Sequence, residues 1–417
     1  MALLGAVVER SGVPAPGPAT SGTGVAMSAV PELWDLTTVA EDEVVFHLHS
    51  PDTLEMVGVR GGWPGPGYEV ITGLRPGTSL LRHGIATRTL DRPPGELLCR
   101  FATVNDVHFG ETECGKLSDI ADTVGYLTAG GMDARGMTDA RDKLQALFEK
   151  LGPVVENSSP EGATPYPELM SRAAITEIAA IDPAAVVVKG DLTASGLVGE
   201  YDAFLQCYLG SFGDRLLHVR GNHDAFSGRH YASEPCQEMA LDGATIALLD
   251  TVIEGRDSGQ ARREQLEWLD ELGARADQPV LVFGHHHAWK PGSVNRAPDY
   301  FGINPNDSER LVEVIARRPA ICGYFAGHTH RNRVRRFAET GEVPYAEVAC
   351  VKDFPGSWAE YRVFEGGILQ VHRRLSSPAA LAWSEKCRGL FWGMYPAYAL
   401  GRLEDRCFPI MPRTPAT

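Results

Sequence analysis

Five short clusters of histidine, aspartate and asparagine each follow directly after an apolar run. The clusters are Asp106-Val107-His108, Gly190-Asp191, Gly221-Asn222-His223-Asp224, Gly284-His285 and Gly327-His328-Thr329-His330. Imidazole nitrogens and carboxylate or amide oxygens suit divalent ions such as Mn, Fe, Zn or Ni, and the lack of paired cysteines argues against a closed structural zinc site. The clusters predict one dinuclear metal site, and metal-assisted hydrolysis is the chemistry that we expect from it.

Strands must bring these clusters together. Six apolar runs have the length of buried strands, and helical stretches separate several of them; the runs are residues 101–104, 185–188, 216–219, 245–249, 280–283 and 321–325. One predicted helix carries Leu266, Trp268, Leu269 and Leu272 at a spacing that buries a single face. Five of the six runs end in a potential ligand, as functional groups do at the carboxyl ends of strands in an α/β sheet. Any one cluster could equally be a core or surface feature, but five in this order favour a site.

The part of the chain before these clusters has a different composition. Residues 1–29 are rich in Ala, Gly, Pro, Ser and Thr, which predicts a flexible tail. Residues 30–95 carry β-type runs, such as 43–48 and 68–71, between Gly and Pro turns and predict a small all-β sandwich. Within it, residues 71–78 resemble a turn of fibronectin type III domains.

The remaining chain predicts an α/β body at 96–376 and an extension at 377–417. An insertion at about 111–165 separates the first two clusters. It could be a lid over the site or a surface elaboration, and the surface elaboration is the simpler interpretation. The stretch 352–356 predicts a tight turn, with Lys352 reaching a substrate phosphate as the weaker alternative. Aromatic residues predict that the extension packs back onto the body; they are Trp383, Phe391, Trp392, Tyr395 and Tyr398.

Composition excludes several classes of protein. The chain has 417 residues and a formal net charge of -15, which disfavours broad binding to nucleic-acid backbones. Its eight cysteines lack C-x-x-C spacing and predict free thiols. No run approaches the roughly 18 to 20 apolar residues of a membrane-spanning helix, and no basic residue precedes the short apolar N-terminal stretch. We expect a soluble, cytoplasmic protein with no membrane partner. No P-loop, Rossmann or serine-hydrolase motif stands in a suitable sequence context, which disfavours nucleotide-driven motors, dehydrogenases and serine hydrolases.

The order of the clusters resembles the calcineurin-like metallophosphoesterases, whose pattern is D-x-H, G-D, G-N-H-D or E, a single His and G-H-x-H. The resemblance covers roughly residues 100–373 and implies an α/β (α+β) sandwich of two mixed β-sheets flanked by helices, here preceded by the small all-β domain. It also implies two divalent ions, Mn, Fe or Zn, sharing a bridging hydroxide. One ion would be held by Asp106, His108, Asp191 and His330, and the other by Asp191, Asn222, His285 and His328.

The resemblance also suggests catalytic roles beside the metals. It implies that His223 faces the substrate, where it stabilises the transition state or protonates the departing alkoxide. Asp224 is expected to orient that imidazole. Three consecutive histidines leave the ligand at the fourth cluster open; the family pattern favours His285, with His286 facing the substrate and His287 structural.

Two sequence features indicate which members of this family the chain resembles. Purple acid phosphatases have Gly where this chain has His108, and a ligating Tyr where it has Ala194. The stretch 190–196, followed by Glu200 and Tyr201, resembles class III cyclic nucleotide phosphodiesterases instead. The leading hypothesis is therefore a phosphodiesterase acting on a small-molecule phosphoester, possibly a cyclic nucleotide. The alternatives are a phosphomonoesterase on the same scaffold, a catalytically idle binding protein, and a nuclease, which the acidic charge disfavours; the native metals and the oligomeric state stay open.

Overall fold

The computed structural model describes residues 9–11, 34–49, 67–115, 159, 162–228, 231–293, 301–390 and 395–413, the first of these segments as backbone only. Most of the predicted tail, and most of the predicted insertion at 111–165, lie outside the described residues. In the part of the chain that is described, no helix is long and apolar enough to cross a bilayer. All eight cysteines are free, as predicted, and six of them are buried.

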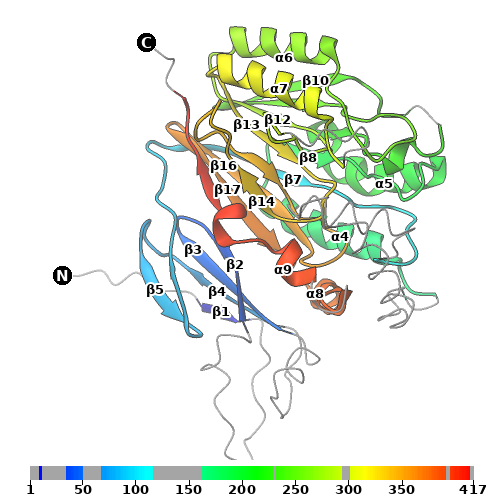
Figure 1. The fold of residues 1–417 in the computed structure, drawn as a ribbon. Helices are drawn as coiled ribbons and strands as arrows, with labels where there is room; N and C mark the ends of the chain where they lie inside the picture. The colour runs from blue at the N-terminus through cyan, green and yellow to red at the C-terminus, as the bar shows by residue number, and fades with distance from the viewer. Residues whose placement is uncertain are drawn as a thin grey trace, which may run out of the picture.

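The body consists of two six-stranded mixed sheets (Figure 1). The first has the order β18-β17-β16-β7-β8-β9 and comprises β7 (Leu97–Val104), β8 (Val186–Lys189), β9 (Leu216–Val219), β16 (Ser357–Phe364), β17 (Gly367–Arg374) and β18 (Phe408–Ile410). The second has the order β10-β11-β12-β13-β15-β14 and comprises β10 (Cys236–Leu241), β11 (Ala244–Leu249), β12 (Val280–Phe283), β13 (Ile321–Ala326), β14 (Arg333–Arg335) and β15 (Tyr345–Glu347). The six predicted strands are confirmed.

Parallel strands in each sheet point their carboxyl ends to one edge. In the first sheet β7, β8 and β9 run parallel, and in the second β11, β12, β13 and β15 do. A shared core of apolar side chains joins the two sheets. At its centre Phe101 stacks on Tyr361 at 4.5 Å between ring centroids, and Phe283 contacts both rings edge-on. The core therefore fixes how the two parallel edges face one another.

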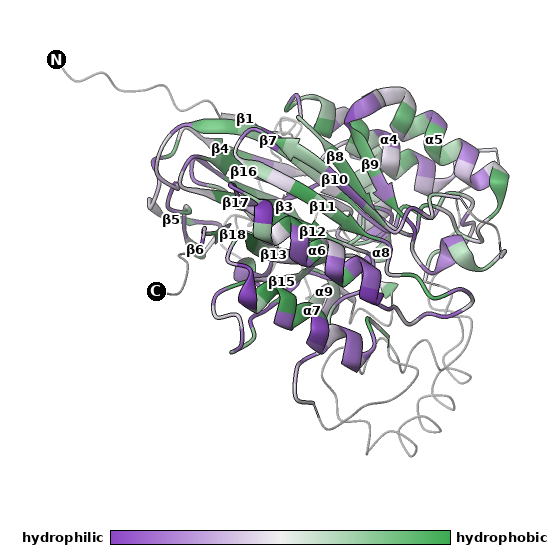
Figure 2. Cartoon of the chain, turned by 90° about the horizontal axis from the view of Figure 1, so that it is seen from above, coloured by the Kyte–Doolittle hydropathy of each residue, from purple (hydrophilic) through white to green (hydrophobic). Residues whose placement is uncertain are grey.

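Helices cover the outer faces of the sandwich. The second sheet is covered by α6 (Arg263–Arg275) and α7 (Pro305–Arg317), and the first by α4 (Tyr166–Ala179), α5 (Val198–Phe212) and α8 (Pro378–Cys387). The predicted helix is confirmed as α6, whose Leu266, Leu269 and Leu272 are buried. Figure 2 shows hydrophilic residues alternating with hydrophobic ones along α6 and α7, whereas β11 and β12 are mainly hydrophobic. The mixed α/β sandwich predicted from the sequence is thus confirmed.

The N-terminal strands form a small all-β unit against the first sheet. A four-stranded antiparallel sheet has the order β1-β4-β3-β2 and comprises β1 (Glu9–Ser11), β2 (Trp34–Val39), β3 (Glu43–Leu48) and β4 (Tyr68–Thr72). A hairpin of β5 (Ser79–Arg82) and β6 (Ile85–Arg88) completes the unit. Its apolar side chains share a core with Cys407, and Ala40 packs on Leu369 and Val371 of β17. The unit is therefore packed directly onto the body.

Buried charges also join this unit to the body. Arg362 of β16 donates to Glu41 and Asp42 at 2.8 and 2.7 Å and to Glu43 at 2.8 Å. Arg373 of β17 contacts Glu43 and Glu360, and Glu360 also accepts from Arg362. Burial would raise the pKa of Glu360, but Arg373 and Arg362 lower it to about 2.

This pKa predicts how stability depends on pH. A carboxyl whose pKa falls on folding stabilises the fold above its unfolded value, near 4.5, and loses that contribution as the pH drops toward 2. The loss is on the order of 3 kcal/mol. Glu360→Gln is expected to lower the free energy of unfolding at pH 7 and to flatten its decline between pH 4.5 and 2, measured by urea titration. Glu267→Gln, which removes an exposed partner of Arg263 on α6, is the control and should change little; an unchanged pH slope in Glu360→Gln would contradict the assignment.

The C-terminal segment lies on the body. Trp383 of α8 stacks on Tyr166 of α4 at 4.2 Å. In α9 (Tyr395–Ala399) the Tyr395 hydroxyl donates to Asp353 and, beside it, the Tyr398 hydroxyl donates to the Thr329 carbonyl, both at 2.8 Å. Phe391 and Trp392 lie outside the described residues. The contact of Tyr398 reaches the turn that carries the fifth sequence cluster, at Thr329.

Candidate dinuclear metal centre

The seven predicted ligands converge where the parallel strands of the two sheets end. Asp106 and His108 follow β7, and Asp191 and Asn222 follow β8 and β9; His285 follows β12, and His328 and His330 follow β13. All seven side chains are buried. Because the first four come from one sheet and the last three from the other, the site exists only when the sandwich has closed.

Asp191 occupies the middle of the group. Its Oδ2 lies 3.3 Å from His108 Nε2 and its Oδ1 lies 3.3 Å from His285 Nε2. Two sets of ligand atoms, each within 4.8 Å of one another, meet around it: Asp106 with His108 and His330, and Asp106 with Asp191 and His285. This position brings the Asp191 carboxylate next to a histidine from each of the two sheets.

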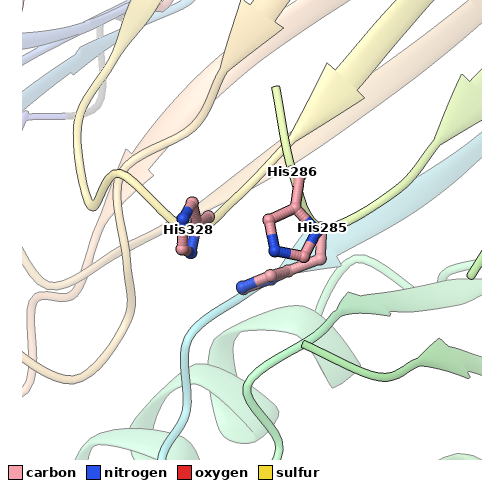
Figure 3. Close-up of side chains that lie close together, drawn as sticks. All are labelled: His285, His286 and His328. Carbon is pink, nitrogen blue, oxygen red and sulfur yellow. The ribbon is translucent and has the colours of Figure 1, made fainter. Parts of the chain in front are cut away.

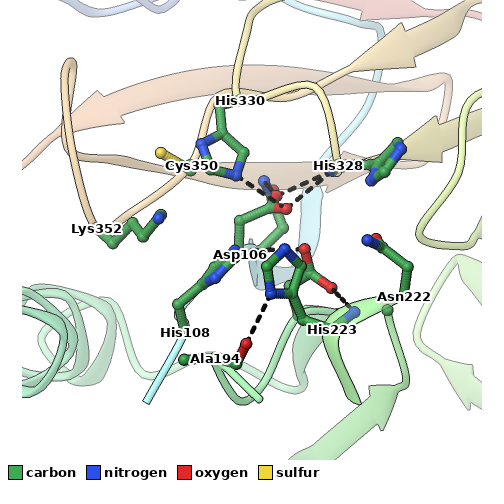
Figure 4. A network of polar contacts seen from close by, with 12 residues as sticks. Asp106, His108, Ala194, Asn222, His223, His328, His330, Cys350 and Lys352 are labelled. Atoms are coloured by element: carbon green, nitrogen blue, oxygen red, sulfur yellow. Dashed lines mark hydrogen bonds and ion pairs between the residues drawn. The ribbon is translucent and has the colours of Figure 1, made fainter. Parts of the chain in front are cut away.

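The remaining ligand atoms complete the two sets. His285 Nε2 lies 3.1 Å from Asn222 Oδ1, and His330 Nε2 lies 3.4 Å from Asp106 Oδ1 (Figure 4). The buried Nε2 of His328 has no hydrogen-bond partner among the described residues. A buried ring nitrogen without a partner is costly unless something else binds it. Oxygen and imidazole donors in this arrangement fit two divalent ions.

Burial sets the protonation of the histidines. It lowers the pKa of His108 and of His328 well below 6.5, so both rings are neutral, as metal ligands must be. Burial would raise the pKa of Asp191, but the neighbouring His285 and His223 lower it well below its usual value. Burial would lower the pKa of His285, but Asp191 raises it to about 9, so this ring must lose a proton before it can bind a metal. The centre therefore offers two neutral imidazoles, His108 and His328, beside an ionised carboxylate.

The backbone is strained at most of the ligands. Asp106, His108, Asp191, His328 and His330 have positive φ angles of 53, 47, 49, 68 and 52°, and they are five of the eight described non-glycine residues with φ in this region. Such angles cost on the order of 1–3 kcal/mol each and persist where the surrounding structure enforces them. Here each chain segment must turn sharply after its strand to aim a side chain at the common centre.

Two glycines of the clusters allow the ligands to approach the backbone. A Cβ atom at Gly221 would collide with Oδ1 of Asp191, and one at Gly327 would lie 2.7 Å from Oδ2 of Asp106. No side chain fits at either position. Gly221 and Gly327 are therefore required by the packing of the predicted ligands Asp191 and Asp106.

Several ligands are held by groups that the sequence analysis missed. Lys189 presents its carbonyl 2.8 Å from His285 Nδ1, Glu111 lies 3.3 Å from His108 Nδ1, and Asp257 accepts from the Asn222 amide at 3.1 Å. Asp353 lies 3.2 Å from His330 Nδ1, and Asn105 contacts Asp106. These partners lie outside the five clusters or, like Asn105, beside one, and no spacing in the sequence marks them as second contacts of a metal ligand.

Asp224 does not orient His223, and that expectation is wrong. The Asp224 carboxylate accepts from the backbone N–H groups of Leu192, Thr193 and Gly221 at 3.0, 2.9 and 2.7 Å, so it fixes the turns around Asp191. His223 Nδ1 instead lies 2.7 Å from the carbonyl of Ala194 (Figure 4). A carbonyl only accepts, so Nδ1 carries the hydrogen and Nε2 is the nitrogen that can exchange a proton.

The fold gives each of the three consecutive histidines different contacts. Figure 3 shows His285 and His286 beside His328, and ligand atoms of these three rings lie within 4.8 Å of one another. Only His285 reaches Asp191 and Asn222. His286 is fully buried, its Nδ1 lies 2.8 Å from the Thr251 hydroxyl, and it does not line the cavity, so the expectation that it faces the substrate is wrong. His287 is buried as well, and burial lowers its pKa to about 3.

The comparison with known families agrees with this site. The model of the family described as calcineurin-like phosphoesterase matches residues 99–332, which include all seven predicted ligands. This match covers more than half of the chain.

The chain belongs to the calcineurin-like phosphoesterase family.

Relatives within the family match part of the chain. A glycerophosphodiester phosphodiesterase of Enterobacter lignolyticus (strain SCF1) is 26% identical over 170 residues, which cover 38% of this chain and 59% of that protein. A cAMP/cGMP dual specificity phosphodiesterase of Mycobacterium tuberculosis (strain CDC 1551 / Oshkosh) is 27% identical over 225 residues, which cover 51% of this chain and 61% of that protein. The chain thus spans about three fifths of the length of these two relatives. A dimetal phosphatase structure from Danio rerio has a TM-score of 0.45 and 15% identity, covering 67% of this chain and 98% of that one.

A cavity of about 660 Å³ opens over this centre. Besides the ligands Asp191, Asn222, His108, His328 and His330, it is lined by His223, by two phenylalanines and by charged side chains. Four of these are carboxylates outside the ligand set: Glu111, Glu113, Asp257 and Asp353. Lys352 is the only Lys or Arg among the described lining residues, and its ammonium is paired with Glu111. Burial would lower the pKa of Lys352, but Glu111 raises it well above its ordinary value, so the lysine is charged.

Asp353→Asn is expected to weaken metal binding at this centre. The Asp353 carboxylate lies 3.2 Å from His330 Nδ1 and also accepts from Tyr395 and from the Cys350 thiol at 2.8 Å, so it holds the His330 ring in one orientation. Loss of such a partner commonly weakens metal affinity by roughly 10- to 100-fold. Titration of stripped protein with Mn²⁺, followed by electron paramagnetic resonance, measures the change. Asp182→Asn, at an exposed aspartate that contacts Arg215, is the matched control; equal affinity in both variants would remove Asp353 from this role.

Proposed function

We propose that the chain is a dinuclear metal-dependent phosphodiesterase. The ligand set is Asp106, His108, Asp191 and His330 for one ion, and Asp191, Asn222, His285 and His328 for the other. Two divalent ions bound there would supply an activated water and neutralise charge on the phosphoryl group. Every other contribution comes from the cavity wall of the protein itself.

His223 supplies the proton in this proposal. With Nδ1 held by the Ala194 carbonyl at 2.7 Å, its Nε2 can give a proton to the departing alcohol oxygen. The backbone N–H of His223 also donates to Asp191 Oδ1 at 3.1 Å, which ties the imidazole to the centre of the site. The residue is therefore placed to act on a group bound beside Asp191.

The charge of the cavity supports a diester over a monoester. A phosphodiester carries one negative charge at neutral pH, whereas a phosphomonoester carries close to two. The single described cation in the wall, Lys352, is already paired with Glu111, and three further carboxylates face the same space. Beyond the charge of the two proposed ions, the described lining residues offer no free Lys or Arg for the additional negative charge of a monoester. The names of the two relatives above point to phosphodiesters as well.

The test compares two chromogenic esters. Protein stripped of metal and resupplied with Mn²⁺ is assayed with bis(p-nitrophenyl) phosphate and with p-nitrophenyl phosphate, beside Asn222→Ala. We expect a higher kcat/KM for the diester, and its loss in the variant. A preference for the monoester would make the protein a phosphatase, and absence of metal-dependent turnover on both would favour an idle binding protein.

Within this proposal a cyclic nucleotide is the substrate to test next. The relative from Mycobacterium tuberculosis is named for cAMP and cGMP, and a cavity of about 660 Å³ lies within the range of small-molecule sites. Hydrolysis of 3′,5′-cyclic AMP against glycerophosphoethanolamine separates a nucleotide phosphodiesterase from one that acts on glycerol esters.

A further inference from the structure

Two loops meet beside His223 at the mouth of the cavity. One contains Gly196 and leads into α5, and the other continues from His223 through Ser227. The Ser227 hydroxyl donates to the Gly196 carbonyl at 2.5 Å, and a Cβ atom at Gly196 would lie 2.8 Å from the Asp224 carbonyl oxygen. The loops are therefore in direct contact and form one surface.

This surface exposes apolar side chains. Leu197, Val198 and Phe226 are 51, 45 and 47% exposed. Seven large apolar side chains are exposed among the described residues, and three of them lie in these two segments, Val198 being the first residue of α5. Single exposed apolar residues are ordinary, but Phe226 also lines the cavity, which indicates a ligand contact.

Phe226 connects this surface to the proposed chemistry. Its ring centroid lies 4.8 Å from that of His223, and its side chain lines the cavity. Because His223 is the proposed proton donor to the leaving alcohol, the substituent on that alcohol must extend past the same ring. Phe301, which stacks on His328 at 3.9 Å, lines the cavity as well.

We propose that Phe226 forms a binding surface for a flat apolar ring on the leaving alcohol of the substrate. This inference rests on the proposed function for the direction in which the alcohol departs. A nucleobase or an aryl group can stack on the exposed phenyl ring, whereas glycerol or another small polar alcohol gains nothing from it. Phe226 is then a specificity-determining residue.

An equilibrium measurement tests this surface independently of turnover. Methyl phenylphosphonate and methyl methylphosphonate are both monoanions and differ in one ring, and neither carries a good leaving group. Their dissociation constants are measured by calorimetry on protein loaded with Mn²⁺. We expect the wild type to bind the phenyl compound about tenfold more tightly, and Phe226→Ala to lose that difference. Leu209→Ala removes a side chain that is 46% exposed on α5 and does not line the cavity, so it should keep the difference.

The same variants are then compared in kinetics. Phe226→Ala should lower kcat/KM for bis(p-nitrophenyl) phosphate by about tenfold and leave release of ethanolamine from glycerophosphoethanolamine within twofold of the wild type. Equal binding of the two phosphonates by the wild type, or a preference that survives Phe226→Ala, would overturn the inference. A phenyl preference that depends on Phe226 in a protein without diester turnover would instead uphold the surface and reject the proposed function.

Discussion

Asp191→Ala is expected to remove both metal ions and with them the activity. The Asp191 carboxylate lies 3.3 Å from a nitrogen of His108 and 3.3 Å from a nitrogen of His285, so it belongs to both ligand groups at once. Without it neither group retains its complete set, and several kcal/mol of transition-state stabilisation are lost, which corresponds to roughly a 10³-fold fall in kcat or more.

Metal content by mass spectrometry and hydrolysis of bis(p-nitrophenyl) phosphate measure this result together. The wild type should bind close to two ions per chain, and the variant fewer than one. Asp270→Asn, at a carboxylate on α6 that pairs with Arg317 and Arg318, is the control and should retain metal and rate. If Asp191→Ala keeps both ions and full turnover, this carboxylate is needed neither for metal binding nor for catalysis.

His223→Ala is expected to have the second largest effect on kcat, and unlike Asp191→Ala it should leave the metal content unchanged. We expect two ions per chain to remain, because the seven ligands are untouched, while kcat falls by about 10²- to 10⁴-fold. The ring lies at the wall of the cavity, with its centroid 4.5 Å from that of His108 and its Nδ1 bound to the Ala194 carbonyl. Loss of metal together with retained turnover would contradict the assignment.

The leaving group distinguishes a proton donor from a purely electrostatic role. A p-nitrophenolate departs without protonation, whereas an alkoxide needs a proton, so His223→Ala should harm hydrolysis of an alkyl diester such as glycerophosphoethanolamine more than that of bis(p-nitrophenyl) phosphate. Equal losses on both esters would leave transition-state stabilisation as the role of His223. His218→Ala is the matched control, since His218 of β9 hydrogen-bonds to Tyr201 and does not line the cavity.

The strands and the convergence of the candidate ligands could be predicted from the sequence because they depend on local patterns. The runs that became β7, β8, β9, β11, β12 and β13 are mainly apolar, which is the pattern of strands buried on both faces. Each cluster follows its strand directly, and parallel strands deliver such residues to one edge. The alternation of α and β elements therefore predicted both the fold class and the convergence of seven side chains.

The supporting contacts could not be predicted because they join distant parts of the chain. Asp353 reaches His330 from a turn after β15, and Glu111 reaches both His108 and Lys352, which is 241 positions away. Asp224 sits next to His223 in sequence, yet its carboxylate turns toward three backbone N–H groups instead. Neighbours in sequence point in different directions when the backbone turns sharply, so adjacency alone misassigned this residue.

By itself the sequence determined the order of the six strands and the seven candidate ligands that follow them, because hydrophobic periodicity and the donor chemistry of side chains are properties of short segments. Tertiary structure alone decided which of three adjacent histidines meets Asp191 and which carbonyl holds His223. It likewise decided that the described lining of the cavity holds one paired lysine and four carboxylates outside the predicted ligand set. It also decided that Phe226 stands exposed beside His223. These features depend on the closure of one sheet over the other, and on backbone angles at Asp106, Asp191 and His328 that only the assembled core enforces.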